Sequence, residues 1–290
     1  MRLACIDIGT NTTRLLVAEP DGPGLRTVLV ERAYASLAHV GREGALGADT
    51  IAAVTRAVAE QIAVAKAAGA VSIDVVATAG VRAAGDGPAL RAAVAAAGGP
   101  SLRLLSGDEE ARLAFRGATC RLPQGSSDRV GVLDIGGGST ELAVGCCQSG
   151  VDWLVSLPTG SAVLTDELLE SDPPAQAELA AARARVEELF TDVAAPPVTA
   201  AYAVGGSAGT LYRLVGAVLE ADALCRTLER LVEAPSAELA AALGLDVRRA
   251  RLLPAGIVLL QRAVEAIGVT PRMGSGGVRE GVLLERLAAG

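Results

Sequence analysis

Two short segments of this sequence combine glycine with small polar side chains, each just after an aspartate. The residues that could contact a ligand are Gly9, Thr10 and Asn11 in the first segment and Gly136, Gly137, Gly138 and Ser139 in the second. A turn with glycine where the backbone needs a positive φ presents successive N–H groups to one point, which favours an anion. We therefore predict that residues 9–12 and 136–140, the first and second glycine turns, bind phosphate oxygens.

The aspartates before these turns, Asp7 and Asp134, are candidates for holding a metal ion. A carboxylate at the end of a strand can bind Mg²⁺ directly or through water while the metal bridges phosphate oxygens. Either segment alone is better explained as a tight turn capped by an aspartate, because short glycine motifs often occur without function. The presence of the same pattern twice favours the binding interpretation.

The glycine turns belong to a duplicated unit. Residues 3–19 and 130–145 both read as strand, turn and strand, and their aspartates, first glycines and later apolar positions correspond at one constant offset. Alternating strand and helix signals follow in each half. We predict an α/β chain of two domains with one topology: residues 1–118, with a helix over 278–290 packing back on them, and residues 119–277.

Several boundaries can be predicted from capping and turn signals. We expect a helix over residues 49–68 with Asp49 as its N-cap, and a linker over residues 119–128, which contain a proline, a glycine and two serines. Asp172 and Pro173 are expected to begin a helix that ends near Val193. After a strand over residues 200–204 and a loop over 205–210, the helical pattern resumes at Leu211.

Composition narrows the function classes. The 26 basic and 33 acidic residues give a net charge of −7, which argues against a nucleic-acid partner, and no apolar stretch reaches membrane-spanning length. Five cysteines without C-x-x-C spacing and the absence of a signal-peptide pattern suggest a reducing, cytoplasmic location. His39, the single histidine, is expected in a surface loop, so acid–base chemistry falls to carboxylates.

Four segments together resemble the exopolyphosphatase/guanosine pentaphosphate phosphatase (Ppx/GppA) family: residues 7–11, 106–112, 134–141 and 274–281. The wider pattern DIGTN, DIGGGSTE and VGGSAGT is similar to the actin, heat-shock chaperone and sugar-kinase superfamily, whose kinases and chaperones lack the G-D-E-E-A-R segment. The resemblance implies two actin-like (ribonuclease H-like) domains of duplicated topology, with an active-site cleft between them.

The resemblance also implies roles for single residues. Glu110 is the catalytic base that acts on water, and Arg82 faces the phosphates. Asp134 and Glu141 serve the metal together with Asp7, and Gly206 and Ser207 lie in the loop on the nucleotide side and contact phosphate. Considered without the family, Glu109 and Glu110 are better explained by the preference of acidic residues for a helix N-terminus.

The expected activity is Mg²⁺-dependent hydrolysis of the terminal phosphoanhydride bond of inorganic polyphosphate, with Mn²⁺ as an alternative metal. Guanosine pentaphosphate is the alternative substrate; an actin-like ATPase or kinase and a non-catalytic alarmone or phosphate sensor are further alternatives. Both a monomer and a homodimer stay open. The family often has serine at the position of Ala79, and Arg248, Arg249 and Arg251 could line an anionic path or form a solvated helix face.

Overall fold

The computed structural model describes residues 1–34, 37, 40, 44–123 and 128–289. The chain divides into two compact units, one formed by Met1–Leu122 with Ser275–Gly290 and the other by Pro123–Gly274. His39 and residues 124–127 of the expected linker lie outside the described residues. No helix in the described ranges combines the length and apolar character that crossing a bilayer requires.

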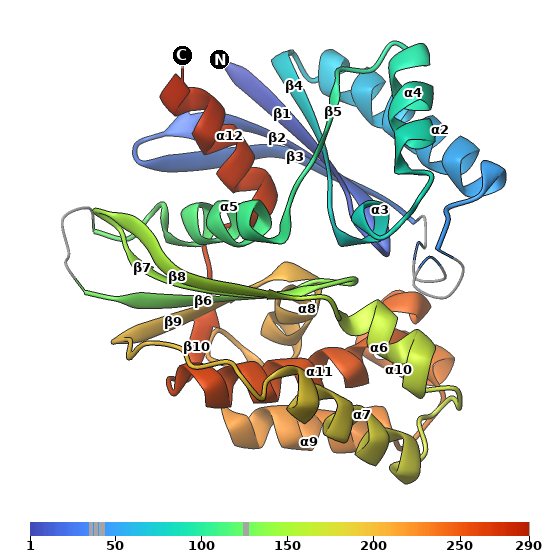
Figure 1. Ribbon diagram of the computed structural model, residues 1–290, viewed down its shortest axis with the longest axis vertical. Coiled ribbons are helices and arrows are strands. Elements are labelled where there is room, and N and C mark those ends of the chain that lie inside the picture. The colour runs from blue at the N-terminus through green and yellow to red at the C-terminus, as the bar shows by residue number, and fades with distance from the viewer. Residues whose placement is uncertain (35–36, 38–39, 41–43, 124–127, 290) are drawn as a thin grey trace. The chain divides into compact units, whose positions relative to one another are not determined.

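The first unit is built on a five-stranded sheet with the order β3-β2-β1-β4-β5. Its strands are β1 (Arg2–Ile8), β2 (Thr12–Asp21), β3 (Gly24–Tyr34), β4 (Ala70–Ala77) and β5 (Leu102–Leu104). Its helices are α2 (Ala48–Ala67), α3 (Ala79–Arg82), α4 (Gly87–Ala96), α5 (Gly107–Thr119) and α12 (Val278–Ala289). The β1–β2 and β2–β3 pairs are antiparallel, whereas β4 pairs in parallel with both β1 and β5 (Figure 1).

Alternation along β1 assigns its side chains to the two faces of this sheet. Ile6 and Ile8 belong to the core that packs against α2 and α4, whereas Leu3 and Cys5 belong to the core formed with α5 and α12. Asp7 follows Leu3 and Cys5 at the same spacing of two residues. Its side chain therefore lies on the sheet face that α5 and α12 cover.

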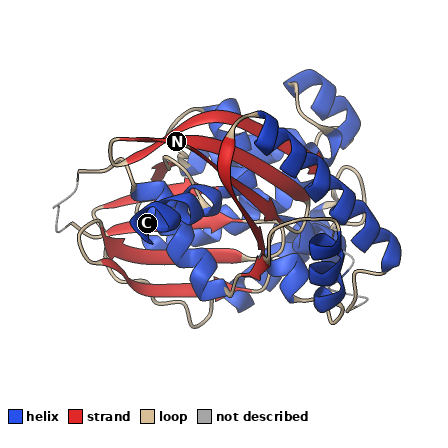
Figure 2. Ribbon diagram, turned by 90° about the horizontal axis from the view of Figure 1, so that it is seen from above, coloured by secondary structure: helices blue, strands red, loops and turns tan. Residues whose placement is uncertain are grey.

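The second unit repeats this plan with the strand order β10-β9-β6-β7-β8. Its strands are β6 (Val130–Ile135), β7 (Thr140–Cys146), β8 (Gly150–Leu157), β9 (Ala200–Val204) and β10 (Pro271–Met273). Its helices are α6 (Ser161–Leu168), α7 (Gln176–Leu189), α8 (Gly205–Val215), α9 (Ala221–Leu231), α10 (Ser236–Leu243) and α11 (Val247–Ile267). Figure 2 separates the strands from these helices by colour. Two mixed five-stranded sheets of matching topology confirm the predicted duplication.

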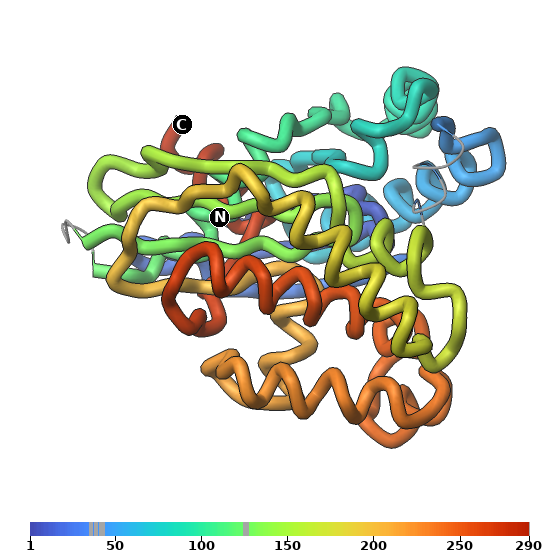
Figure 3. Tube along the Cα trace, turned by 60° about the horizontal axis from the view of Figure 1, so that its bottom comes forward, coloured from blue at the N-terminus to red at the C-terminus, as the bar shows by residue number. Residues whose placement is uncertain are grey.

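The core of the second unit is centred on α11. Leu253, Ile257 and Leu260 of this helix are fully buried, and α11 packs against α6, α7, α8 and α9 (Figure 3). Leu133 and Leu142 belong to the same core, so their sheet face is the one that the helices cover. The alternate positions of β6 and β7 point to the opposite face.

Three predicted boundaries are wrong. The N-cap of α2 is Gly47, and Asp49 lies inside the first turn of the helix. The helix expected from Asp172 begins at Gln176, because Glu178 accepts hydrogen bonds from the N–H groups of residues 170, 171 and 175 and so fixes a later start. Asp172 instead accepts hydrogen bonds from Ser236 N and Oγ, at 2.8 and 2.6 Å.

The third wrong boundary bears on the candidate site. Residues 205–210 were expected to form a loop, but α8 begins at Gly205 directly after β9. Gly205 has a φ of +91°, which lets the chain turn from strand to helix without a linking loop. Gly206 and Ser207 thus lie in the first turn of a helix.

Candidate functional site

Both glycine turns close with the same hydrogen bond. Gly9 N donates to Thr12 O and Gly136 N donates to Ser139 O, each at 3.1 Å. The expectation that these glycines need positive φ is wrong, because none of residues 9 and 136–138 has one. At Gly136 glycine is needed for space instead, because a Cβ there would lie 2.9 Å from Ser139 O; a Cβ on Gly9 would make a tight contact of 3.2 Å with Thr12 O.

The start of α6 orients the second glycine turn. Ser161 N donates to Gly136 O at 2.9 Å, and the next two N–H groups of α6 donate to Gly137 O. Those carbonyls are thereby turned towards the helix, and the N–H groups of Gly137 and Gly138 donate to no carbonyl of the described backbone. A Cβ on Gly160 would lie 2.5 Å from the carbonyl carbon of Gly137, so only glycine permits this approach.

Sequence reasoning missed Gly160 and Ser161, although a signal was available. The segment Pro158-Thr159-Gly160-Ser161 follows a strand and precedes an apolar helical stretch, which is a typical helix start. What the sequence did not reveal is that this start packs on a turn more than twenty residues earlier in the chain.

Asp134 and Glu141 are direct neighbours on adjacent strands. They are paired in the β6–β7 register, so both side chains point to the same face of the sheet, opposite the helices that pack on Leu133 and Leu142. Asp134 is 8% and Glu141 2% exposed. Ser156, the partner of Glu141 on β8, donates its hydroxyl to Glu141 Oε1 at 2.8 Å and fixes the orientation of that carboxylate.

The first turn of α8 approaches the same carboxylate. A Cβ on Gly205 would lie 2.4 Å from Asp134 Oδ1, so a side chain at this position would displace the aspartate. Ser207 Oγ is buried and has no hydrogen-bond partner among the described residues. Gly256 of α11 provides the space for Ser207, since a Cβ there would lie 2.4 Å from that oxygen. The second unit therefore brings together Asp134, Glu141 and Gly205, while the predicted Ser207 contacts α11 at Gly256.

The first glycine turn is rich in polar atoms without partners. Asp7 Oδ1, Thr10 Oγ1 and Asn11 Nδ2 are all buried, and none makes a hydrogen bond within the described part of the chain. A buried polar atom without a partner costs free energy, on the order of 1–3 kcal/mol for each group. Two such atoms in the turn and one on the aspartate before it are the arrangement expected where a ligand completes the hydrogen bonding.

Asp7 differs from its counterpart in the second unit. It is paired with Arg14 in the β1–β2 register, where the equivalent Asp134 is paired with Glu141. Burial raises the pKa of Asp7, and the positive charges of Arg14 and Arg279 oppose this rise. The first unit therefore pairs its strand-end carboxylate with a cation, whereas the second unit pairs two carboxylates.

Glu110 is buried at the start of α5 and is bound to Arg82. It is 7% exposed, and Arg82 Nη1 donates to its Oε2 at 2.9 Å and to Leu105 O at 2.8 Å. Arg82 is the last residue of α3, the short helix that follows β4. Two residues that are 28 positions apart are thus joined within the first unit.

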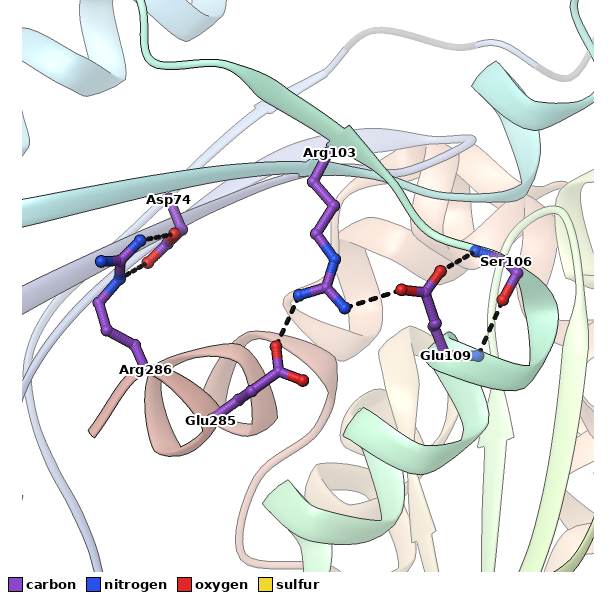
Figure 4. A network of polar contacts seen from close by, with 6 residues as sticks. All are labelled: Asp74, Arg103, Ser106, Glu109, Glu285 and Arg286. Atoms are coloured by element: carbon purple, nitrogen blue, oxygen red, sulfur yellow. Dashed lines mark hydrogen bonds and ion pairs between the residues drawn. The ribbon is translucent and has the colours of Figure 1, made fainter. Parts of the chain in front are cut away.

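The neighbouring Glu109 has a different environment. Its carboxylate accepts from Ser106 N at 2.8 Å while Ser106 Oγ accepts from Glu109 N, which is a capping box at the start of α5 (Figure 4). Arg103 donates to Glu109 at 2.8 Å and to Glu285 of α12 at 2.6 Å. The preference of acids for a helix N-terminus therefore explains Glu109, and it leaves the burial of Glu110 to be explained.

The arginines near the start of α11 do not form one solvated face. Asp246 caps this helix by accepting from the N–H groups of Arg248 and Arg249, and the side chain of Arg249 is buried. Arg251 donates Nη2 to Leu169 O, and its Nη1 is buried without a partner among the described residues. Contact of these arginines with substrate stays a prediction.

Comparison with known proteins is decisive for the family. The model of the Ppx/GppA phosphatase family matches residues 16–289. The chain belongs to this family. Its two units have the actin-like fold, and a solved structure of the Aquifex aeolicus family member superposes with a TM-score of 0.82 at 27% identity, covering 100% of this chain and 98% of that one.

Named relatives of this Ppx/GppA chain include two mycobacterial proteins. Exopolyphosphatase 1 of Mycobacterium leprae is 29% identical over 310 residues, covering 99% of this chain and 90% of that protein. Exopolyphosphatase 2 of Mycobacterium tuberculosis is 32% identical over 250 residues, covering 82% of this chain and 77% of that protein. Each alignment thus covers most of this chain and most of the relative.

Proposed function

We propose that this Ppx/GppA family member hydrolyses the terminal phosphoanhydride bond of inorganic polyphosphate. The observation that carries the proposal is the buried Glu110, held by Arg82 in the unit that also contains the first glycine turn. The printed names of the mycobacterial relatives support polyphosphate as the substrate. Guanosine pentaphosphate is the second candidate, since the family name covers both phosphatases and both substrates present phosphates to the turns.

The donor set fits a magnesium ion. Mg²⁺ is usually bound through one or two carboxylates, with water and substrate phosphates completing its octahedron. Asp134 and Glu141 supply two adjacent carboxylates, and no group of three or more His, Cys, Asp or Glu suited to a metal occurs among the residues described. When bound there, the metal would neutralise charge on the phosphate oxygens.

The proposed step needs one base and oriented donors. Glu110 accepts a proton from water as the water oxygen bonds to the terminal phosphorus, and the bond from that phosphorus to the bridging oxygen breaks. The bonding electrons leave with the shortened chain. Little covalent chemistry is required of the protein in phosphoryl transfer, so positioning of water by Glu110 and of phosphate by the turn N–H groups supplies most of the effect.

Phosphate release tests the proposal. The purified protein is assayed with Mg²⁺ on polyphosphates of defined length, guanosine pentaphosphate and ATP, each with and without a chelator. Release from polyphosphate that disappears with chelator is expected. Release from guanosine pentaphosphate alone would favour the second candidate, and ATP turnover alone would support an ATPase or kinase. Absence of release from all three would contradict the proposal.

A further inference from the structure

Three polar side chains form a row across the sheet of the second unit. Asp134 on β6 is paired with Glu141 on β7, and Glu141 is paired with Ser156 on β8. Directly paired residues of adjacent strands point to the same face, so the three side chains are neighbours on the face opposite the helices (Figure 1). Ser156 therefore lies next to the carboxylate pair that we propose for the metal.

The carboxylate of Glu141 is almost fully buried and is hydrogen-bonded to Ser156. Glu141 is 2% exposed, and Ser156 Oγ donates to its Oε1 at 2.8 Å. The next row on the same face consists of Val132, Ala143 and Leu154, whose apolar side chains offer no donor. A hydrogen bond to an ionised carboxylate is among the stronger kinds, so this bond restricts the rotation of Glu141. One carboxylate oxygen is thus engaged within the protein.

The engaged oxygen should affect Mg²⁺ and Ca²⁺ differently. Ca²⁺ takes more oxygen ligands than Mg²⁺, in a flexible geometry, and can bind both oxygens of one carboxylate. Mg²⁺ demands a near-ideal octahedron and usually retains several waters. A glutamate whose Oε1 already accepts from a serine is less able to offer both oxygens to one cation, and its fixed orientation suits the stricter geometry.

We propose that Ser156 is a positioning residue that makes the pair of Asp134 and Glu141 selective for Mg²⁺ over Ca²⁺. It acts through its hydrogen bond to Glu141 Oε1. The inference rests on the proposed function, which assigns the metal to this pair. The competing interpretation is that Ser156 only satisfies a buried carboxylate. Removing the hydroxyl would then weaken both cations alike, whereas the proposal predicts a change in the ratio of their affinities.

Metal binding without substrate separates the two interpretations. Mn²⁺ is titrated into the metal-free protein and followed by electron paramagnetic resonance, and Mg²⁺ or Ca²⁺ is then added to displace it. Ser156→Ala is expected to weaken Mg²⁺ binding by about tenfold, as loss of a residue that orients a metal ligand commonly does. Ca²⁺ binding should change by less than about twofold, because the released oxygen becomes available to it, so the affinity ratio falls by about fivefold or more.

Ser156→Thr and Ser149→Ala are the matched controls. Threonine keeps the hydroxyl and is favoured in strands, so the Mg²⁺ to Ca²⁺ affinity ratio should stay within about twofold of the wild-type value. Ser149 lies in the turn at the other end of the β7–β8 hairpin, where its hydroxyl is hydrogen-bonded to Cys146 Sγ. Its replacement should leave both affinities unchanged. Thermal melting of each variant shows whether a loss of metal binding reflects unfolding.

The outcomes are distinct. An unchanged affinity ratio in Ser156→Ala, or a ratio that moves towards Mg²⁺, would overturn the role of Ser156 and leave the proposed function standing. Wild-type protein that binds no Mn²⁺ would also overturn the inference, because the two carboxylates would then not form a metal site in the protein. Absence of phosphate release by the wild-type protein would overturn the proposed function, whatever the ratio of metal affinities.

Discussion

Replacing Glu110 with glutamine removes the proposed base and conserves its shape. Glutamine keeps an oxygen that can accept from Arg82 but has no charge and little basicity. General-base contributions are typically about 10²–10⁴-fold, so kcat should fall by about that factor, equivalent to roughly 3–5 kcal/mol in activation free energy. Binding of tripolyphosphate should change little, because the glycine turns are untouched.

The expected cost in stability is much smaller than the loss of activity. Breaking a fully buried ion pair costs about 3–5 kcal/mol, but the Arg82 side chain is 30% exposed and can still donate to glutamine and to Leu105 O. We expect about 1 kcal/mol, which lowers the melting temperature by about 2–4 °C. Single-turnover phosphate release and differential scanning calorimetry measure the two effects separately.

Glu109→Gln is the matched control, because the two side chains differ in role. Glu109 completes the capping box and binds Arg103, so its replacement should cost about 0.5–2 kcal/mol of stability and leave kcat within about threefold. The reasoning would be refuted if Glu110→Gln kept wild-type turnover. A loss of turnover confined to Glu109→Gln would show that the base is the wrong carboxylate.

Three further predictions concern the second unit. Gly160→Ala should displace the Gly137 carbonyl and weaken tripolyphosphate binding at least about tenfold, measured by calorimetry, while overpacking costs about 1–3 kcal/mol; unchanged affinity would refute this. Asp134→Asn should raise the Mg²⁺ concentration needed for half-maximal activity and weaken Mn²⁺ binding followed by electron paramagnetic resonance, and an unchanged metal dependence would contradict the metal role. Three backbone N–H groups hold the pKa of Glu178 at about 2, below its ordinary 4.5, so its contribution to stability is complete above pH 4.5 and is lost as the pH falls towards 2. Glu178→Gln should therefore lower the melting temperature at pH 7 by an amount that disappears over that interval, and a pH-independent difference would contradict the assignment.

The duplicated topology could be predicted because the signals are local. Each glycine turn lies between two apolar runs that alternate between the faces of one sheet, and each unit must bury its own sheet. The start of α7 was predicted wrongly because another carboxylate competed with the local signal. Asp172 is a residue type that often caps a helix. In the structure the carboxylate of Glu178 accepts from the N–H group before α7, and Asp172 accepts from Ser236 instead.

The roles of the candidate site residues stay predictions, and the sequence did not reveal the contacts that support the two glycine turns. Glycine at residues 9 and 136 was correctly associated with turns, yet the reason is a close carbonyl rather than a positive φ, which no residue pattern distinguishes. The contact of Gly160 with the second turn and the contact of Gly205 with Asp134 depend on how helices pack on a sheet. Such contacts arise only in the folded chain.

Hydrolysis in ¹⁸O-labelled water tests the central claim most directly. Polyphosphate of defined length is incubated with the protein and Mg²⁺, and the released phosphate and the shortened chain are analysed by mass spectrometry. Attack of water on the terminal phosphorus places one ¹⁸O atom in each released phosphate and none in the chain, whose bridging oxygen stays behind. Two results would contradict terminal hydrolysis by activated water: ¹⁸O in the shortened chain, or transfer of the terminal phosphoryl group to an acceptor other than water.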